Sequence, residues 1–282
     1  MLGVSNMEQY EKSIVPQIES VYGRFTPIER TIADFFIHNT EDMDFSSKNI
    51  SQKLFVSDAA LSRFSKKCGF RGYREFIFSY KQGFMEKPYK NMTNCTKQVL
   101  GTYQELLNKS YALIDTDQMV RVTELFSEKK RVYAYGRGSS ALVAQELKLR
   151  FMRIGVNMES IVDSHVMKMN FVLLDSDCLV IGISISGKTK EVIESLKAAK
   201  LRNARTILIT SRKEKEFEEF CDEIILIAVK EHLDNGRAIS PQFPILVMVD
   251  IFYAHFLQLD ILRKEELHER TIDAIYNRNN SK

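Results

Sequence analysis

Apolar residues between positions 26 and 80 recur at helix spacing. In "PIERTIADFFIHN" the apolar positions that share one helical face are Ile28, Ile32, Phe35 and Phe36. Thr26 precedes Pro27, which is the order of a helix cap followed by a first-turn proline. This stretch predicts an amphipathic helix that begins at Pro27.

Two further helical patterns follow this first one. "SSKNISQKLFV" predicts a short helix with three inward-facing residues, Ile50, Leu54 and Phe55. "SDAALSRFSKKCGF" predicts a helix capped by Ser57 and ended at Gly69, whose buried face consists of Leu61, Phe64 and Cys68. Because only a tight turn at Val56-Ser57 separates the two, we expect a helix-turn-helix motif.

From Arg131 the pattern changes to buried strands alternating with helices. Strand patterns such as "RVYAYG", "DCLVIGIS", "ARTILITS" and "EIILIAV" are apolar almost throughout. Helical patterns such as "ALVAQELKLRFMRIG" and "KEVIESLKAAKLRN" separate them. Strands of this kind predict a parallel sheet covered by helices on both faces.

Two segments have a less specific pattern. Residues 81–105 mix Gly, Pro, Asn and Thr without a strong period, which indicates a linker that runs into the next helix. The last long segment, from Pro244, predicts one or two helices that are apolar on more than one side. Its large residues are candidates for an oligomer interface, and burial within one subunit explains them nearly as well: Ile245, Val249, Phe252 and Phe256.

Length and composition indicate a globular protein of two domains. The chain has 282 residues, of which 44% are hydrophobic and 27% charged, and domains usually have roughly 100–200 residues. The net charge is only +3, but its distribution is uneven. Residues 1–60 hold five basic and nine acidic side chains, a net −4, whereas residues 61–90 hold eight basic and two acidic ones, a net +6.

The cysteine spacing and the length of the apolar segments indicate in which cellular compartment the protein is located. Cys68, Cys95, Cys178 and Cys221 are far apart and form no CxxC pair, which argues against a zinc site and a disulfide framework. The chain shows neither a signal-peptide pattern nor an apolar run near the ~20 residues of a membrane span. We therefore expect a cytoplasmic protein with no metal, no cofactor and no membrane partner.

A hydroxyl-rich turn joins an apolar strand to a helix in "GISISGKTKEV". Ser184, Ser186 and Thr189 supply hydroxyl groups, and Gly187 permits close approach of the backbone. Ligands of open parallel sheets bind at the carboxyl ends of strands, where a helix N-terminus offers unpaired N–H groups to an anion. Each serine alone could be an ordinary turn or cap residue, but together they predict a phosphate site.

A second turn, "YGRGSS", also follows a strand. It contains Gly136 and Gly138 but has alanine where a dinucleotide-binding motif has its third glycine, so that interpretation is weak. The alternative is a tight turn that places Ser139 and Ser140 in the same crevice as the Ser184 turn.

These motifs resemble a known family. "GRGSS" followed by "SISGKTKEV" resembles the sugar isomerase (SIS) phosphosugar-binding domain, and "VSDAALSRFSKKCGFRGYREF" resembles the recognition segment of RpiR-type transcriptional regulators. The resemblance runs from about residue 20 to 260. It implies a five-stranded SIS fold, sugar-phosphate sensing and a dimer or tetramer, with Ser140, Ser184, Ser186 and Thr189 on the phosphate or sugar hydroxyls. The chain departs from the family pattern at two positions. Ala60 stands where Thr or Ser is common in the recognition helix, and Cys68 stands where Leu is usual.

The third predicted helix also carries the candidate DNA contacts. The N-terminal part of a recognition helix reaches base edges, and basic residues near its end hold phosphates. We expect Ser62 and Arg63 to read bases, and we include Ser57 and Ala60 in the DNA-binding set. The expected phosphate contacts are Lys66, Lys67, Arg71 and Arg74. On charge alone, a solvated basic face of a helical bundle is the competing interpretation.

Catalysis is the alternative function, because some SIS proteins are isomerases. Isomerisation needs a general base, normally Glu or His. His165 follows the predicted strand "GVNMESIVD", and Glu191 and Glu146 lie on helices after the two turns. The position of Glu191 near a helix N-terminus is explained by stabilisation from the helix dipole, and Glu146 is explained as a solvated residue on the helix surface. For His165, we expect a contact with a sugar hydroxyl rather than removal of a proton.

The sequence as a whole predicts a sugar-responsive regulator and not an enzyme. We expect a helix-turn-helix DNA-binding domain over residues 1–80, a linker over 81–105 and an α/β SIS domain over 106–282. The expected effector-binding set is Gly138, Ser139, Ser140, His165, Ser184, Ser186, Gly187 and Thr189. The expected partners are operator DNA, a phosphorylated sugar and further copies of the chain, as a homodimer or homotetramer. The alternative is a phosphosugar isomerase or lyase with a helical appendage.

Overall fold

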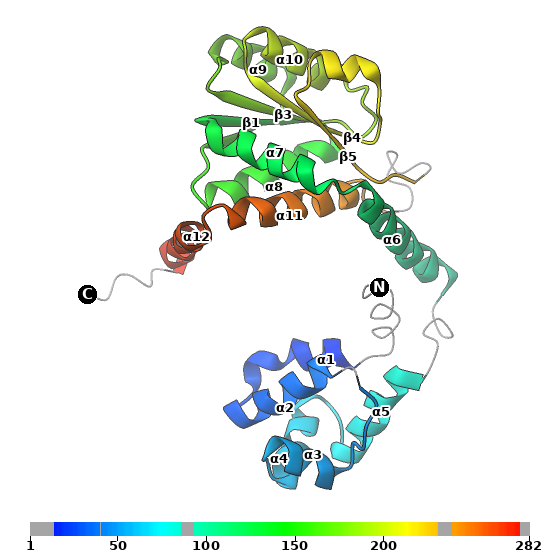
Figure 1. Ribbon diagram of the computed structural model, residues 1–282. Coiled ribbons are helices and arrows are strands. Elements are labelled where there is room, and N and C mark those ends of the chain that lie inside the picture. Colours follow the sequence, from blue (N-terminus) through cyan, green and yellow to red (C-terminus); the bar gives the residue numbers. More distant parts are fainter. Residues whose placement is uncertain (1–13, 40, 86–92, 231–238, 277–282) are drawn as a thin grey trace, which may run out of the picture. The chain divides into compact units, whose positions relative to one another are not determined.

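The computed structural model describes residues 14–39, 41–85, 93–230 and 239–276, with the backbone alone for 82–85. The chain divides into two compact units, Met1–Asn94 and Cys95–Lys282 (Figure 1). The first unit is helical, and its helices are α1 (Val15–Ser20), η1 (Tyr22–Arg24), α2 (Pro27–His38), α3 (Ser47–Leu54), α4 (Asp58–Lys67) and α5 (Tyr73–Met85).

Aromatic side chains form the centre of the first unit. Phe36 of α2 contacts Phe76 and Tyr80 of α5, with ring centroids 4.9 Å apart in both pairs. Phe64 of α4 lies 5.2 Å from Phe76, and the Tyr80 hydroxyl donates a hydrogen bond to the Phe36 carbonyl at 3.0 Å. Edge-to-face pairs of this kind add to the stabilisation from area burial. They hold α2, α4 and α5 around one core.

A capping box begins α2. The Glu29 N–H donates to Thr26 Oγ1 at 3.4 Å, and Glu29 Oε2 accepts from the Thr26 N–H at 2.8 Å, as expected for a Thr-x-x-Glu start. The same carboxylate accepts a hydrogen bond from Lys67 Nζ at 2.6 Å. Because the Glu29 side chain is only 5% exposed, this ion pair joins the beginning of α2 to the end of α4.

The expected helix-turn-helix is present as α3 and α4. Ser57 caps α4 through a hydrogen bond from the Ala60 N–H at 3.1 Å, and Gly69 follows the helix with φ +90°. The inward assignment of Phe55 is wrong, and Ile28 does not share the buried face of its helix. Phe55 is 96% exposed because it lies past the end of α3 in a left-handed conformation, and Ile28 is 55% exposed on the outer side of α2.

The second unit contains a five-stranded parallel sheet in the order β2-β1-β3-β4-β5. This confirms the expected α/β SIS architecture. The strands are β1 (Arg131–Gly136), β2 (Met158–Ile161), β3 (Cys178–Ile183), β4 (Arg205–Thr210) and β5 (Glu223–Leu226). The helices are α6 (Asn94–Leu113), α7 (Thr116–Glu128), α8 (Ser139–Met152), α9 (Ser164–Asn170), α10 (Lys190–Leu201), α11 (Phe243–Gln258) and α12 (Ile261–Tyr276), with the short turns η2 (Phe171–Leu173) and η3 (Lys215–Glu219).

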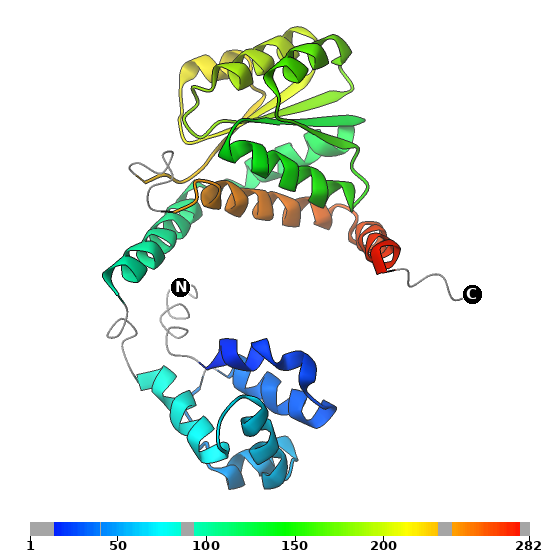
Figure 2. The same ribbon diagram turned by 180° about the vertical axis from the view of Figure 1, so that it is seen from behind.

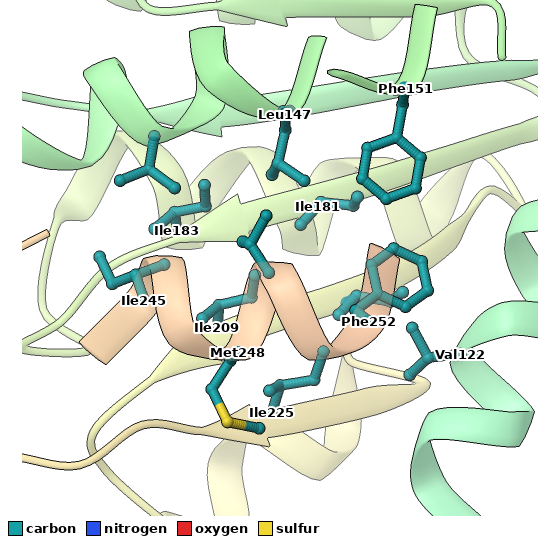
Figure 3. Close-up of a cluster of buried hydrophobic side chains, with 14 of the residues drawn as sticks. Val122, Leu147, Phe151, Ile181, Ile183, Ile209, Ile225, Ile245, Met248 and Phe252 are labelled. Carbon is teal, nitrogen blue, oxygen red and sulfur yellow. The ribbon is translucent and has the colours of Figure 1, made fainter. Parts of the chain in front are cut away.

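Helices cover both faces of the sheet. α9 and α10 lie on one face, and α7, α8 and α11 lie on the other, as both views show (Figures 1 and 2). On the latter face, Ile181 and Ile209 pack with Met248 and Phe252 of α11 (Figure 3). Burial on both faces is the reason why the central strands are apolar over most of their length.

The apolar residues of α11 belong to the core of their own subunit. Ile245, Val249, Phe252 and Phe256 are at most 5% exposed and pack in the cluster under the sheet. Of the two explanations that the sequence left open, burial within one subunit therefore accounts for these residues.

The segment expected as a linker is helical at both ends, because α5 continues to Met85 and α6 begins at Asn94. Lys87, Lys90 and the rest of residues 86–92 lie outside the described residues. Within the described ranges, no single helix has the length and apolar character needed to cross a membrane. Among the described helices, only α11 and α12 taken together reach this length and apolar character, and the chain bends by 115° between them.

The Glu29–Lys67 pair leads to a pH-dependent stability prediction. Burial raises the pKa of Glu29, but hydrogen bonds from Lys67 and Thr26 outweigh it and the pKa is lowered below its ordinary value of 4.5. The pair should therefore stabilise the fold fully above that value and lose its effect as the pH falls through the lowered pKa. We expect Glu29→Gln to reduce the free energy of unfolding by about 1 kcal/mol at pH 7, with the difference from wild type vanishing in acid.

Calorimetric unfolding of the full chain between pH 7 and pH 3 would measure this difference. Glu41→Gln, at an exposed position of the same unit, is the matched control and should have little effect at any pH. A Glu29→Gln deficit that stayed constant down to pH 3 would contradict the ion-pair explanation.

Candidate functional site

The β1–β3 pair places two helix-leading turns side by side. β1 lies between β2 and β3 in the sheet. The chain therefore passes from β1 through α8 to β2 on one side of β1, and then crosses to β3 on the other side. Gly136, the last residue of β1, is in register with Ile183, the last residue of β3. α8 and α10 then leave on opposite faces of the sheet. Such a reversal of strand order opens the crevice in which doubly wound sheets bind ligands.

Hydrogen bonds within the turn after β3 organise its hydroxyl groups. Ser184 Oγ donates to Thr189 Oγ1 at 2.9 Å and accepts from the Thr189 N–H at 3.3 Å. Ser186 Oγ accepts from the Lys188 N–H at 3.3 Å. Thr189 is the N-cap of α10, but its side chain makes no capping hydrogen bond. Among the described residues, no side chain accepts a hydrogen bond from the first-turn N–H groups of α10, which face the turn.

The end of β4 holds this turn in place, and the sequence analysis did not identify the residues that do so. The Ile185 carbonyl accepts hydrogen bonds from the Ser211 N–H at 3.0 Å and from Ser211 Oγ at 2.7 Å. Gly187 adopts φ +64°, and a side chain there would lie 2.9 Å from the Phe217 ring. The two hydroxyl residues that end "ARTILITS" could have indicated this contact, because hydroxyl groups at the end of a buried strand normally have hydrogen-bond partners.

The turn after β1 depends on a close backbone contact. A Cβ on Gly136 would lie 2.5 Å from the Ser140 carbonyl oxygen. Gly138 has φ +56° and is the N-cap of α8, to which it brings no side chain. Ser139 is half-buried and Ser140 is 7% exposed, and within the described part of the chain neither hydroxyl has a hydrogen-bond partner. These hydroxyls and the start of α8 lie at the same sheet edge as the Ser184 turn.

His165 lies at the same sheet edge but is exposed. It is in the first turn of α9, where Asp163 Oδ1 accepts from its N–H at 2.8 Å. Arg137, in the turn after β1, donates from Nη1 to the Val162 carbonyl at 2.9 Å. This bond joins the end of β1 to the end of β2. The structure therefore brings all eight expected effector residues to the carboxyl edge of β1, β2 and β3.

A cavity of about 300 Å³ lies between α9 and α10. None of the eight expected effector residues lines it. Its wall includes three largely apolar side chains, Tyr135, Met167 and Phe171. The polar residues of the lining are Ser164, Lys168, Glu191, Glu194 and Ser195. Ser164 and Glu191 are in the first turns of their helices, so the cavity borders the crevice. Sequence reasoning missed Tyr135 because it reads as one more apolar strand residue.

The outer surface of α4 agrees with a recognition helix at most of the expected positions. Arg63, Lys66, Arg71 and Arg74 are exposed and Ser62 is half-exposed. Within the described part of the chain, Arg63 and Lys66 form no ion pair with a carboxylate. Their positive charges are therefore available to an anionic partner.

Three expected DNA contacts have structural roles. Ala60 is 3% exposed, because it packs in the core of the first unit, so its side chain cannot reach DNA and that expectation is corrected. Lys67 is paired with Glu29 and donates to the Arg24 carbonyl at 3.3 Å. Ser57 uses its oxygen to cap α4. Helix periodicity did not distinguish Ala60 and Lys67 from their exposed neighbours, whereas the capping role of Ser57 was predicted.

Clusters of three or more potential metal ligands do not occur in the described ranges.

Comparisons with known proteins match both units. Residues 125–254 match the family model of the SIS domain, and residues 12–87 match that of the helix-turn-helix domain, rpiR family. An uncharacterized HTH-type transcriptional regulator of Clostridium perfringens is 26% identical over 276 residues, which are 94% of this chain and 99% of that protein. The HTH-type transcriptional regulator RpiR of Escherichia coli K12 is 27% identical over 227 residues, 76% and 75% of the two chains.

A solved structure supports the fold over nearly the whole length. The Vibrio vulnificus NanR protein, complexed with ManNAc-6P, superposes with a TM-score of 0.61 at 21% identity. The match covers 94% of this chain and 98% of that one.

The Gly136 contact leads to a stability prediction for the site. We expect Gly136→Ala to reduce the free energy of unfolding by about 1–3 kcal/mol, because the new methyl group meets backbone atoms that cannot rotate away. Gly101→Ala is the matched control. Gly101 is exposed within α6 and has open space around it, so alanine there should stabilise by about 0.5–1 kcal/mol. Denaturant unfolding of both variants tests this, and equal effects would contradict the proposed contact.

Proposed function

Because this chain belongs to the rpiR family of helix-turn-helix proteins and carries a SIS domain, we propose that it is a transcriptional regulator whose operator binding is controlled by a phosphorylated sugar. The observation that carries this proposal is the combination of two sites on one chain. One is an exposed basic recognition helix, and the other is a hydroxyl-lined turn at the reversal point of a parallel sheet. Relatives named as transcriptional regulators match nearly the whole chain.

The DNA-binding part of the proposal rests on α4. Arg63 and Ser62 lie on its outer surface near its middle and would contact base edges in the major groove. Lys66, Arg71 and Arg74 are exposed at and beyond its end and would contact phosphates. Lys67 is assigned to the Glu29 ion pair instead, so the expected phosphate set is reduced by one residue.

The effector-binding part rests on charge and hydrogen-bonding capacity. The Ser184–Thr189 turn offers hydroxyl donors and the N-terminus of α10, both of which favour a phosphate. The neighbouring cavity is lined by two carboxylates, Glu191 and Glu194, and by one ammonium group, Lys168. This balance of charge disfavours a phosphate there, whereas the carboxylates can accept hydrogen bonds from hydroxyl groups. We therefore place the phosphate at the turn, beside Ser139 and Ser140, and direct the sugar hydroxyls towards the cavity, with His165 at its edge.

Control of DNA binding requires a difference between two states of the protein. The effector can shift their balance only by the difference between its affinities for them. In a homodimer or homotetramer that binds a palindromic operator, the spacing of two recognition helices is the quantity that can change. An operator-binding protein of this kind would act in the cytoplasm.

We further propose that the SIS domain binds its ligand without turnover. The relatives that match both units are named regulators, and the same fold can carry different functions in different proteins. An isomerase would need a base in contact with the substrate carbon. His165 is exposed, and its ring has no described partner to orient it, so it suits a contact with a hydroxyl better than proton transfer.

Thermal unfolding with a panel of sugar phosphates tests the effector proposal. A ligand at 100 times its Kd should stabilise the protein by about 2.7 kcal/mol, and its unphosphorylated parent sugar should not. Ser186→Ala should weaken binding at least about tenfold, because it removes a donor to a charged group. Ser127→Ala, next to the start of β1 at the opposite sheet edge, is the control and should bind normally. Equal shifts with the parent sugar, or conversion of the ligand during incubation, would contradict the proposal.

Operator binding by an Arg63→Ala variant tests the recognition helix. Loss of a base contact should cost about 1–3 kcal/mol, which is roughly 5- to 150-fold in affinity, and relax specificity at one position. Sugar-phosphate binding should be unchanged. Arg30→Ala, at an exposed position of α2, is the charge-matched control. Unchanged DNA affinity of Arg63→Ala at fixed salt would show that α4 is not the recognition helix.

A further inference from the structure

Phe55 stands at a position of the helix-turn-helix that normally requires glycine. It follows the last residue of α3 with φ +55° and ψ +40°. The Val56 N–H donates to the Ser51 carbonyl at 3.0 Å, and the Phe55 N–H donates to the Gln52 carbonyl at 3.4 Å. These two bonds are those of a Schellman motif, in which the left-handed residue is usually glycine because a Cβ is strained there.

The Phe55 ring lies outside the described core of its own unit. It is 96% exposed, whereas the buried apolar residues of that unit form a dense cluster without it. A single exposed apolar side chain needs no explanation by itself. Here, however, the exposed ring lies on a strained backbone, and strained positions cluster at functional sites. A glycine would relieve the strain and remove the exposed ring at the same time.

The neighbours of Phe55 indicate which partner would cover the ring. Phe55 lies two residues before Ser57, the N-cap of α4, and the next residues, Asp58 and Ala59, are exposed as well. The N-terminus of a recognition helix enters the major groove. A ring beside that N-terminus cannot hydrogen-bond to base edges, but it can pack on the thymine C5-methyl group, the apolar feature of the major groove.

We propose that Phe55 is a base-reading residue that contacts a thymine methyl group at one position of each operator half-site. This inference rests on the proposed DNA-binding function and adds a specificity contact from outside the recognition helix. It also assigns a role to the strained turn: the left-handed backbone at position 55 directs a large apolar side chain away from the core at the start of α4.

Two substitutions at position 55 separate DNA contact from folding. Phe55→Gly and Phe55→Asn both place a residue that tolerates the left-handed conformation, so the melting temperature of the full chain should be unchanged or raised. Affinity should nevertheless fall at least about tenfold for a duplex selected by the wild-type protein from a randomised pool. The salt dependence of binding should stay the same, because no phosphate contact is removed. Ile28→Ser, at an exposed apolar position of α2, should bind like wild type.

Replacement of thymines by uracils identifies the contact itself. At one position per half-site, loss of the methyl group should weaken wild-type binding about fourfold, the effect of about 0.8 kcal/mol per buried CH₂-sized group. The same replacement should have no effect on Phe55→Gly. Wild-type affinity in Phe55→Gly, or a loss that is the same for every uracil duplex, would overturn the inference.

Two other outcomes have distinct meanings. A change in oligomer mass in Phe55→Gly, with the methyl dependence intact, would show that the ring contacts another protein chain and would overturn a DNA contact. Failure of the wild-type protein to enrich any duplex would overturn the proposed function itself, and this inference with it.

Discussion

The parallel pairing of β1 with β3 is the constraint on which the effector crevice depends. Its register places Gly136 next to Ile183, so the turns that follow the two strands begin side by side. Crossover connections in a parallel sheet are right-handed. The chain goes from β1 to β2 in one direction across the sheet and from β3 to β4 in the other direction. The helices of these two connections, α8 and α10, must therefore lie on opposite faces of the sheet. Two helix N-termini and the hydroxyls of Ser140 and Ser184 then share one edge. Gly136 is essential for this arrangement, because only glycine permits the first turn of α8 to lie so close to the strand.

The first unit depends on a different interaction, the buried carboxylate of Glu29. This group accepts hydrogen bonds from the start of its own helix and from Lys67 at the end of α4. It therefore fixes α4 relative to α2 with a charged contact in addition to the aromatic core. A recognition helix must present its outer residues in one defined orientation, and a partly buried, hydrogen-bonded ion pair restricts that orientation more than apolar packing alone. Using Lys67 in this way removes one positive charge from the surface that remains available to an anion.

Periodicity and turn chemistry predicted most of the fold, but they did not separate structural from functional polar residues. The unbroken apolar strands identified the parallel sheet, and Thr26 and Ser57 were identified as caps because their pattern is local. Ala60 and Phe55 were assigned to the wrong side, and the ion pair of Lys67 was not predicted, because their environments depend on distant parts of the chain. Lys67 forms its ion pair with Glu29, which is thirty-eight residues away in the sequence.

The same limit applies to the site of the second unit. The hydroxyl turn after β3 was visible in the sequence, whereas its anchoring by Ser211 and the cavity behind Tyr135 depend on how β4 and α9 pack.

The two sites differ in what binding can change. The Ser184 turn is held by β4 and by its own hydrogen bonds, so an effector bound at the proposed site would meet a largely preformed cradle and would gain affinity without ordering the chain. The hydroxyls of Ser139 and Ser140 have no partner among the described residues, so the turn after β1 is the part of the crevice with hydrogen bonds still to form. A phosphate that contacts both turns would join the start of α8 to the start of α10. Because these helices pack on opposite faces of the sheet, such a ligand favours one relative position of the two layers, and this is how a small anion could bias an assembly built on either layer.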